Sequence, residues 1–137
     1  MQSVIVPMLT YENGIAAMDS LCRVFGFMEK TRWLDNEGKL SHGEITMNDG
    51  IIMLANGNPD YESPIRHRQN CTSSAKWFSV PYIINGVLVY VDDVQAHFEN
   101  AKKLGARILS GLEFGEPGAR YRAEDLEGQR WMFIQKA

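Results

Sequence analysis

The chain has 137 residues, the usual size of a single folded domain and enough to bury a hydrophobic core. Apolar residues make up 45% and charged residues 23%, the net charge is −3, and no Lys/Arg cluster stands out, which argues against a nucleic-acid partner. The first residues lack the basic start of a secretory signal, no apolar run is long enough to span a membrane, and the two cysteines form no disulfide or zinc pattern. We therefore expect a cytoplasmic protein with no membrane partner.

The first part of the chain predicts the element order β-α-β-β-β. A short apolar run is followed by a helix with Asn13 as its N-cap and Gly26 at its end. Turn sequences then separate three short apolar or alternating runs that are typical of strands. The expected elements are a strand at 4–10, a helix at 14–25, and strands at 27–34, 40–47 and 51–55.

Residues 56–82 break this order. The segment contains Gly57, Pro59, Pro64 and Pro81 and shows no clear hydrophobic period, so we predict a long connector without regular structure. Its basic stretch, 66–68, is expected to be solvated loop charge, although three basic groups in one loop are also able to hold an anion.

From residue 83 the first pattern returns, with a strand at 86–91, a helix capped by Asp92 or Asp93, and strands at 106–112, 120–124 and 130–135. The two halves match at a spacing of 79 residues, which places Tyr90 opposite Tyr11, Gly105 opposite Gly26, and Met132 opposite Met53. Such a repeat predicts two βαβββ modules, 1–55 and 83–137, within one domain of residues 1–137. We expect an α+β fold with a curved mixed sheet around a concave pocket for a small molecule and the helices outside.

Three stretches resemble one protein family. The segment VYVDDVQAHFENAKKLGARI (89–108) is similar to its second-module strand and helix, and AAMDSLCRVFGF (16–27) to its first helix. In RYRAEDLEGQRWMF (120–133), Asp125, Gly128 and Trp131 match the D-x-x-G-x-x-W of its closing hairpin. The chain thus resembles the vicinal oxygen chelate superfamily of glyoxalases, bleomycin-resistance proteins and extradiol dioxygenases. The resemblance implies the fold rather than one activity, because this scaffold hosts several chemistries.

The resemblance also bears on metal binding. Metal-dependent members carry four ligands, usually His and Glu, on the first and last strands of the two modules, and those positions fall at Pro7, Met53, Gly86 and Met132. None of these side chains offers a hard oxygen or an imidazole nitrogen. We therefore expect no metal and no other cofactor, as in the bleomycin-resistance-like branch of the family.

Polar residues on two strands are candidates for catalysis. His42 and Glu44 share a strand face opposite to apolar Ile45 and Met47, and Arg122 and Glu124 alternate in the same way with Tyr121 and Ala123. A His–Glu pair is able to act as a general base while an arginine stabilises an oxyanion. The alternative for Arg122 and Glu124 is an exposed cross-strand charge pattern with no role in chemistry.

Three functions remain open from the sequence. The first is a homodimeric binder that sequesters a small organic molecule in an apolar cavity, with the negative net charge suiting a cationic ligand. The second is a lyase or isomerase that uses His42 and Glu44, and the third is an interaction module with a vestigial cavity. The predicted pocket residues are Leu9, Trp33, His42, Met53, Trp77, Leu88, Tyr90, Arg122 and Met132.

Overall fold

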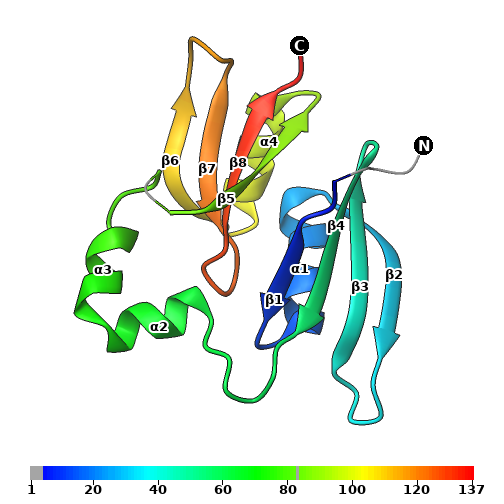
Figure 1. The fold of residues 1–137 in the computed structure, drawn as a ribbon. Helices are drawn as coiled ribbons and strands as arrows, with labels where there is room; N and C mark the ends of the chain where they lie inside the picture. Colours follow the sequence, from blue (N-terminus) through cyan, green and yellow to red (C-terminus); the bar gives the residue numbers. More distant parts are fainter. Residues whose placement is uncertain (1–4, 83) are drawn as a thin grey trace. The chain divides into compact units, whose positions relative to one another are not determined.

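The computed structural model describes residues 5–82 and 84–137 (Figure 1). The chain divides into two compact units, of which the first ends at Glu62 and the second begins at Ser63. No helix among the described residues is both long and apolar enough to cross a membrane.

The first unit is a four-stranded mixed sheet with one helix against one face (Figure 1). Its strand order is β1-β4-β3-β2, in which β1 runs parallel to β4 and the other neighbours are antiparallel. The elements in chain order are β1 (Met8–Tyr11), α1 (Gly14–Phe25), β2 (Met28–Leu34), β3 (Leu40–Met47) and β4 (Gly50–Asn56).

The second unit repeats this topology and adds two short helices before it. Its strand order is β5-β8-β7-β6, with β5 parallel to β8, so the closing strand again lies beside the first strand of its sheet. The elements are α2 (Pro64–Asn70), α3 (Thr72–Phe78), β5 (Gly86–Val91), α4 (Val94–Lys103), β6 (Arg107–Glu113), β7 (Arg120–Glu124) and β8 (Arg130–Gln135).

The predicted α+β class and the duplicated β-α-β-β-β order are confirmed, and the strands form two separate four-stranded sheets. The prediction for the connector was wrong, because it contains α2 and α3. Each helix has only seven residues, which is too short for an apolar period to appear in the sequence. The predicted first strand was too long: β1 begins at Met8, and residue 4 lies outside the described residues.

Each sheet buries one face against its helix. In the first unit, Met18 and Leu21 of α1 and Ile45 and Leu54 of the sheet are completely buried. In the second unit, the Phe133 ring lies 4.4 Å from the His97 ring of α4 and 5.3 Å from the Tyr121 ring. Because side chains alternate along a strand, the residues between these positions lie on the opposite, open faces of the sheets.

One side-chain amide in each unit ties the last strand to the start of the helix. Asn56 Oδ1 accepts a hydrogen bond from the Gly14 N–H at 2.8 Å, and Asn56 Nδ2 donates to the Glu12 carbonyl at 2.9 Å. Gln135 makes the same two bonds, to the Val94 N–H at 2.9 Å and the Asp92 carbonyl at 2.5 Å. Each amide therefore satisfies a helix N-terminal N–H that has no partner within its helix.

These paired bonds correct the predicted spacing of the repeat. The N-caps Asn13 and Asp93 are 80 residues apart, whereas Gly26 and Gly105, both with positive φ at the helix ends, are 79 apart. The spacing changes because the second unit has one residue fewer between its N-cap and the glycine that ends its helix. Tyr90 is therefore not the counterpart of Tyr11, and the 79-residue spacing holds only from the end of the helix onward.

We expect Asn56→Ala to lower the free energy of unfolding by about 1–3 kcal/mol, because it leaves the Gly14 N–H and the Glu12 carbonyl without this partner. Urea unfolding followed by circular dichroism measures the change. Asn36→Ala, in the exposed turn between β2 and β3, is the matched control and should stay within about 0.5 kcal/mol of the parent. Equal midpoints for the two variants would contradict a structural role for the amide.

Candidate functional site

The open face of the second sheet carries a pocket of about 200 Å³. Three side chains that adjoin in the strand register form its floor: Leu88 of β5 pairs with Met132 of β8, and Met132 pairs with Arg122 of β7. The described lining consists of Pro81, Tyr82, Ile84, Gly86, Val87, Leu88, Arg122, Arg130, Trp131 and Met132. The pocket is thus largely apolar and contains two guanidinium groups.

Hydrogen bonds in the turn between β7 and β8 fix the positions of these two strands, which carry part of the pocket lining. Asp125 is buried, and its Oδ1 accepts hydrogen bonds from the N–H groups of Glu127 and Gln129 at 3.0 and 3.1 Å. Its Oδ2 accepts one from Trp131 Nε1 at 3.1 Å. Gly128 has φ +91°, and a Cβ there would come within 3.0 Å of the backbone nitrogen of Ile65. The D-x-x-G-x-x-W motif is therefore a turn-forming and packing motif.

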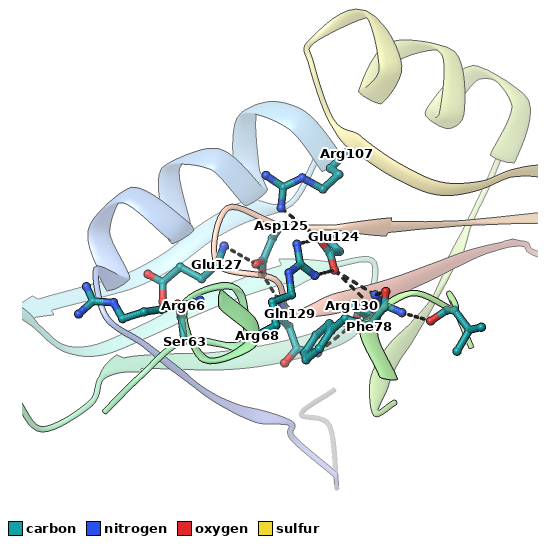
Figure 2. Close-up of polar contacts among 11 residues, drawn as sticks. Ser63, Arg66, Arg68, Phe78, Arg107, Glu124, Asp125, Glu127, Gln129 and Arg130 are labelled. Carbon is teal, nitrogen blue, oxygen red and sulfur yellow. Dashed lines mark hydrogen bonds and ion pairs between the residues drawn. The ribbon is translucent and has the colours of Figure 1, made fainter. Parts of the chain in front are cut away.

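Arg130 connects the wall of the pocket to the sheet (Figure 2). Its Nη2 donates to the carbonyl of Phe78 at 2.6 Å and its Nη1 donates to the carbonyl of Val80. Its Nε donates to Glu124 Oε2 at 3.2 Å. These bonds hold the backbone that follows α3 and leads into Pro81 and Tyr82, so the sheet itself positions this wall.

Glu124 is buried at the centre of an arginine cluster, where Figure 2 shows Arg68, Arg107 and Arg130 converging on it. Arg68 binds both of its oxygens, at 2.6 and 3.1 Å, and Arg107 donates to Oε1 at 3.0 Å. The Phe78 ring lies 5.0 Å from the guanidinium carbons of both Arg68 and Arg130. The cluster therefore joins α2, α3, β6, β7 and β8.

The charges around Glu124 decide its ionisation. Burial by itself would raise its pKa, but the hydrogen bonds from Arg68 and Arg107 and the nearby positive charges hold the pKa of this carboxyl below its usual range. Glu124 is consequently a carboxylate bound by three arginines of the same unit, a state suited to holding structure together.

A second polar group lies on the open face of the first sheet. His42 Nε2 lies 2.8 Å from Glu44 Oε2, and Lys30 Nζ lies 3.6 Å from Glu44 Oε1. The hydrogen bond from His42 lowers the pKa of Glu44; slight burial opposes this, and the Lys30 charge adds to it. The exposed Trp33 ring lies 5.0 Å from the His42 ring, so an aromatic surface adjoins His42 and Glu44.

The structure sorts the predicted pocket residues into groups. Leu88, Arg122 and Met132 come together in the pocket, and Trp33 and His42 come together in the first unit. Met53 pairs with Glu44 and Met8 on the open face, whereas Leu9 pairs with the buried Leu54 on the helix-covered face. The remaining two are exposed but do not line the pocket: Tyr90 on β5 and Trp77 on α3.

Sequence reasoning missed Arg130, Tyr82 and the role of Arg68. Arg130 is two residues from Met132 on the same strand, so alternation already placed it on the pocket face. Arg68 was expected to be solvated, but it is bound to Glu124 across 56 residues of sequence. No sequence pattern indicates that contact, because it depends on α2 packing against the second sheet.

Two of the four expected metal-ligand positions, Pro7 and Gly86, are not the register partners of Met53 and Met132. Met8 rather than Pro7 pairs with Met53, and Leu88 rather than Gly86 pairs with Met132. Thioether and alkyl side chains do not suit zinc, iron, manganese or nickel. Within residues 5–82 and 84–137, no group of three or more His, Cys, Asp or Glu side chains is placed to hold a metal. These residues do not fit the metal of the metal-dependent relatives.

The match to the Glyoxalase/Bleomycin resistance protein/Dioxygenase superfamily extends over residues 8–133, and the chain belongs to this family. Among solved structures, TioX from Micromonospora sp. ML1 is 29% identical, with a TM-score of 0.71 over 98% of this chain and 97% of TioX. No match was found among curated proteins.

More distant structures share the fold alone. A glyoxalase/bleomycin resistance protein from Streptomyces sp. CB03234 is 16% identical, with a TM-score of 0.67 over 95% of this chain and 97% of that one. TnmS3, an antibiotic binding protein from the same source, is 16% identical, with a TM-score of 0.64 over 100% of this chain and 99% of TnmS3.

We expect Glu124→Gln to lower the free energy of unfolding at pH 7 by about 3 kcal/mol, because it leaves three guanidinium groups around a neutral amide. The folded pKa lies below the unfolded one, so this contribution is present above the unfolded pKa of about 4.3 and is lost as the pH falls through the folded pKa. Urea unfolding between pH 3 and 7 should therefore show the gap to the parent narrowing in acid.

Glu116→Gln, in the exposed loop between β6 and β7, is the control for loss of one negative charge. It should change the unfolding midpoint little at any pH. A constant difference between Glu124→Gln and the parent across the pH range would show that the ionised carboxylate is not what stabilises the cluster.

Proposed function

We propose that the protein binds a small aromatic molecule in the pocket on the open face of its second sheet, without turnover. The pocket itself is the observation that carries this proposal: Leu88, Met132 and Ile84 supply apolar surface, and Tyr82 supplies an aromatic wall. Sites of this composition suit ligands that are mostly apolar and carry a few oriented polar groups.

Large exposed aromatic side chains, which occur in each unit, support the same ligand class. Trp33 is 63% exposed, Tyr82 70% and Tyr90 56%. Exposed aromatic surface is unfavourable in water unless a partner covers it, and planar aromatic ligands stack on such rings. TnmS3, whose fold this chain shares, is an antibiotic binding protein, which favours a natural-product ligand.

The chemistry of the pocket favours binding over catalysis. Among its described lining residues there is no His, Cys, Asp or Glu, so the usual general bases and thiol nucleophiles are lacking there. The open-face positions Met8, Met53, Leu88 and Met132 also favour function without the metal of the metal-dependent relatives.

We propose further that the binding form is a homodimer. Met8 is 72% exposed and Leu88 is 45% exposed, on open strand faces of the two units. A second copy of the chain that covers part of this surface while leaving room for a ligand would remove the cost of exposing it to water.

His42 and Glu44 favour a second candidate, a lyase or isomerase. Their 2.8 Å contact, with Glu44 ionised beside it, is the arrangement that orients an imidazole as a general base. The exposed Trp33 ring beside His42 is available to hold a planar substrate against the pair.

Quenching of tryptophan fluorescence by bleomycin, an anthracycline and 1,4-naphthoquinone tests the binding proposal, and we expect at least one micromolar or tighter dissociation constant. Leu88→Gln should weaken that binding by about 5-fold or more, because it places an amide in the apolar floor. Leu126→Gln, at an exposed leucine in the turn between β7 and β8, is the matched control and should leave it unchanged. Equal affinities for both variants, or no binding by any probe, would contradict the pocket.

Two further measurements accompany the binding titration. Chelation with EDTA should leave the dissociation constant unchanged, because the open-face residues do not suit a metal. Sedimentation should give the mass of two chains for the ligand-bound protein; a monomer would refute the dimer and leave the pocket in place.

The second candidate predicts a chemical change in the bound compound. If His42 and Glu44 are catalytic, the wild-type protein returns the compound altered, and His42→Gln slows this conversion by about 100-fold or more without weakening binding. Mass spectrometry of the recovered compound measures conversion, and His67→Gln, at an exposed histidine of α2, is the control. Recovery of unaltered compound from the wild type is the result expected for a binding protein.

A further inference from the structure

We infer that the pocket of the second unit selects aromatic ligands that carry an oxyanion, a carboxylate or a phenolate, with Arg122 as the residue that binds this group. The inference rests on the proposed function and names the ligand class of the same pocket. It differs from the expectation, based on the net charge of −3, that a cationic ligand would fit.

The local charge of the pocket is positive although the chain is acidic. The described lining contains two arginines and no Asp or Glu. Glu124 pairs with Arg130 and also with Arg68 and Arg107. Its single negative charge therefore neutralises only one of these three positive charges. Apolar walls strengthen the effect of these charges by lowering the local dielectric constant. An anionic group entering the pocket is therefore stabilised and a cationic one is repelled.

The two arginines of the lining have different roles. Arg130 is almost completely buried, and each of its three side-chain nitrogens already donates, to Glu124, Val80 and Phe78. Turning it toward a ligand would break the bonds that hold the wall. Arg130 therefore adds positive charge and holds the pocket wall in place, and Arg122 is the arginine that contacts the ligand.

Arg122 is paired with a partly exposed carboxylate. Its Nη1 donates to Glu113 Oε1 at 3.0 Å, and Glu113 is 43% exposed. Arg120 Nη2 also lies 3.6 Å from Glu113. Ion pairs with an exposed partner contribute no more than about 1 kcal/mol, so a ligand carboxylate that binds the planar guanidinium through two parallel bonds is able to replace Glu113.

The register places this cation beside the apolar floor. Arg122 pairs directly with Met132, which pairs directly with Leu88, so a ring lying over the Met132 thioether points its edge substituent toward the guanidinium. A flat ring with one oxyanion at its rim satisfies both parts of the pocket at once. Glu113 then acts as an internal competitor for the same arginine.

Calorimetric titration at pH 7 and low salt with three matched probes, 2-naphthoate, 2-naphthamide and 2-naphthylmethylammonium, tests the inference. We expect 2-naphthoate to bind about 10-fold or more tightly than the amide, and the ammonium compound to bind most weakly. Arg122→Gln should remove this preference while leaving the affinity for the amide within about 2-fold, because the apolar floor is unchanged.

Three further variants separate direct contact from a general effect of charge. Arg120→Gln removes a neighbouring positive charge that does not line the pocket, and the preference for 2-naphthoate should remain. Glu113→Gln removes the competitor and should tighten 2-naphthoate binding about 3-fold or more. Arg122→Lys keeps the charge without the planar fork and should retain a reduced preference, which also covers the case in which the glutamine variant does not fold.

The outcomes for the inference and for the proposed function are distinct. Equal affinities for 2-naphthoate and 2-naphthamide, or a preference that survives Arg122→Gln, would overturn the role of Arg122 while the apolar pocket stands. Absence of binding by all three naphthyl compounds and by the chromophores of the earlier titration would overturn the proposed function itself.

Discussion

A buried carboxylate surrounded by three guanidinium groups holds the second unit together. Glu124 is removed from water, which is unfavourable for an ionised group unless several hydrogen bonds replace the lost hydration. Arg68, Arg107 and Arg130 supply those bonds from α2, β6 and β8. Because Arg130 also binds the carbonyls of Phe78 and Val80, the same cluster fixes the segment that forms one wall of the pocket.

This arrangement separates structural charge from charge that is available to a ligand. Arg130 and Glu124 are almost fully buried and paired with each other, whereas Arg122 lies on the same sheet with a half-exposed partner, Glu113. A buried pair resists change, since removing either partner leaves an uncompensated charge. A pair whose carboxylate is half-exposed exchanges partners at little cost. The pocket thus combines a rigid frame with one replaceable contact.

Apolar and thioether side chains lie on the open faces of both sheets. Met8 beside Met53 and Leu88 beside Met132 provide this surface. Such residues suit an aromatic ring better than a divalent cation. Both units keep the same hydrogen bond between the last strand and the start of the helix, made by the side-chain amides of Asn56 and Gln135. The two units therefore share their framework and differ in their exposed side chains.

The sequence by itself determined the fold class, the order of strands and helices within the two repeats and the family, because period, caps and turn residues are local signals. Asn13, Gly26 and the alternation of Arg130–Gln135 illustrate this. It did not show α2 or α3, whose seven residues are too few for a period, nor the 80-residue spacing of the N-caps. Only the tertiary structure decided that Arg68 binds Glu124 and that Pro81 and Tyr82 face Met132 in one pocket. Contacts of this kind join residues far apart in sequence, and packing rather than local preference selects them.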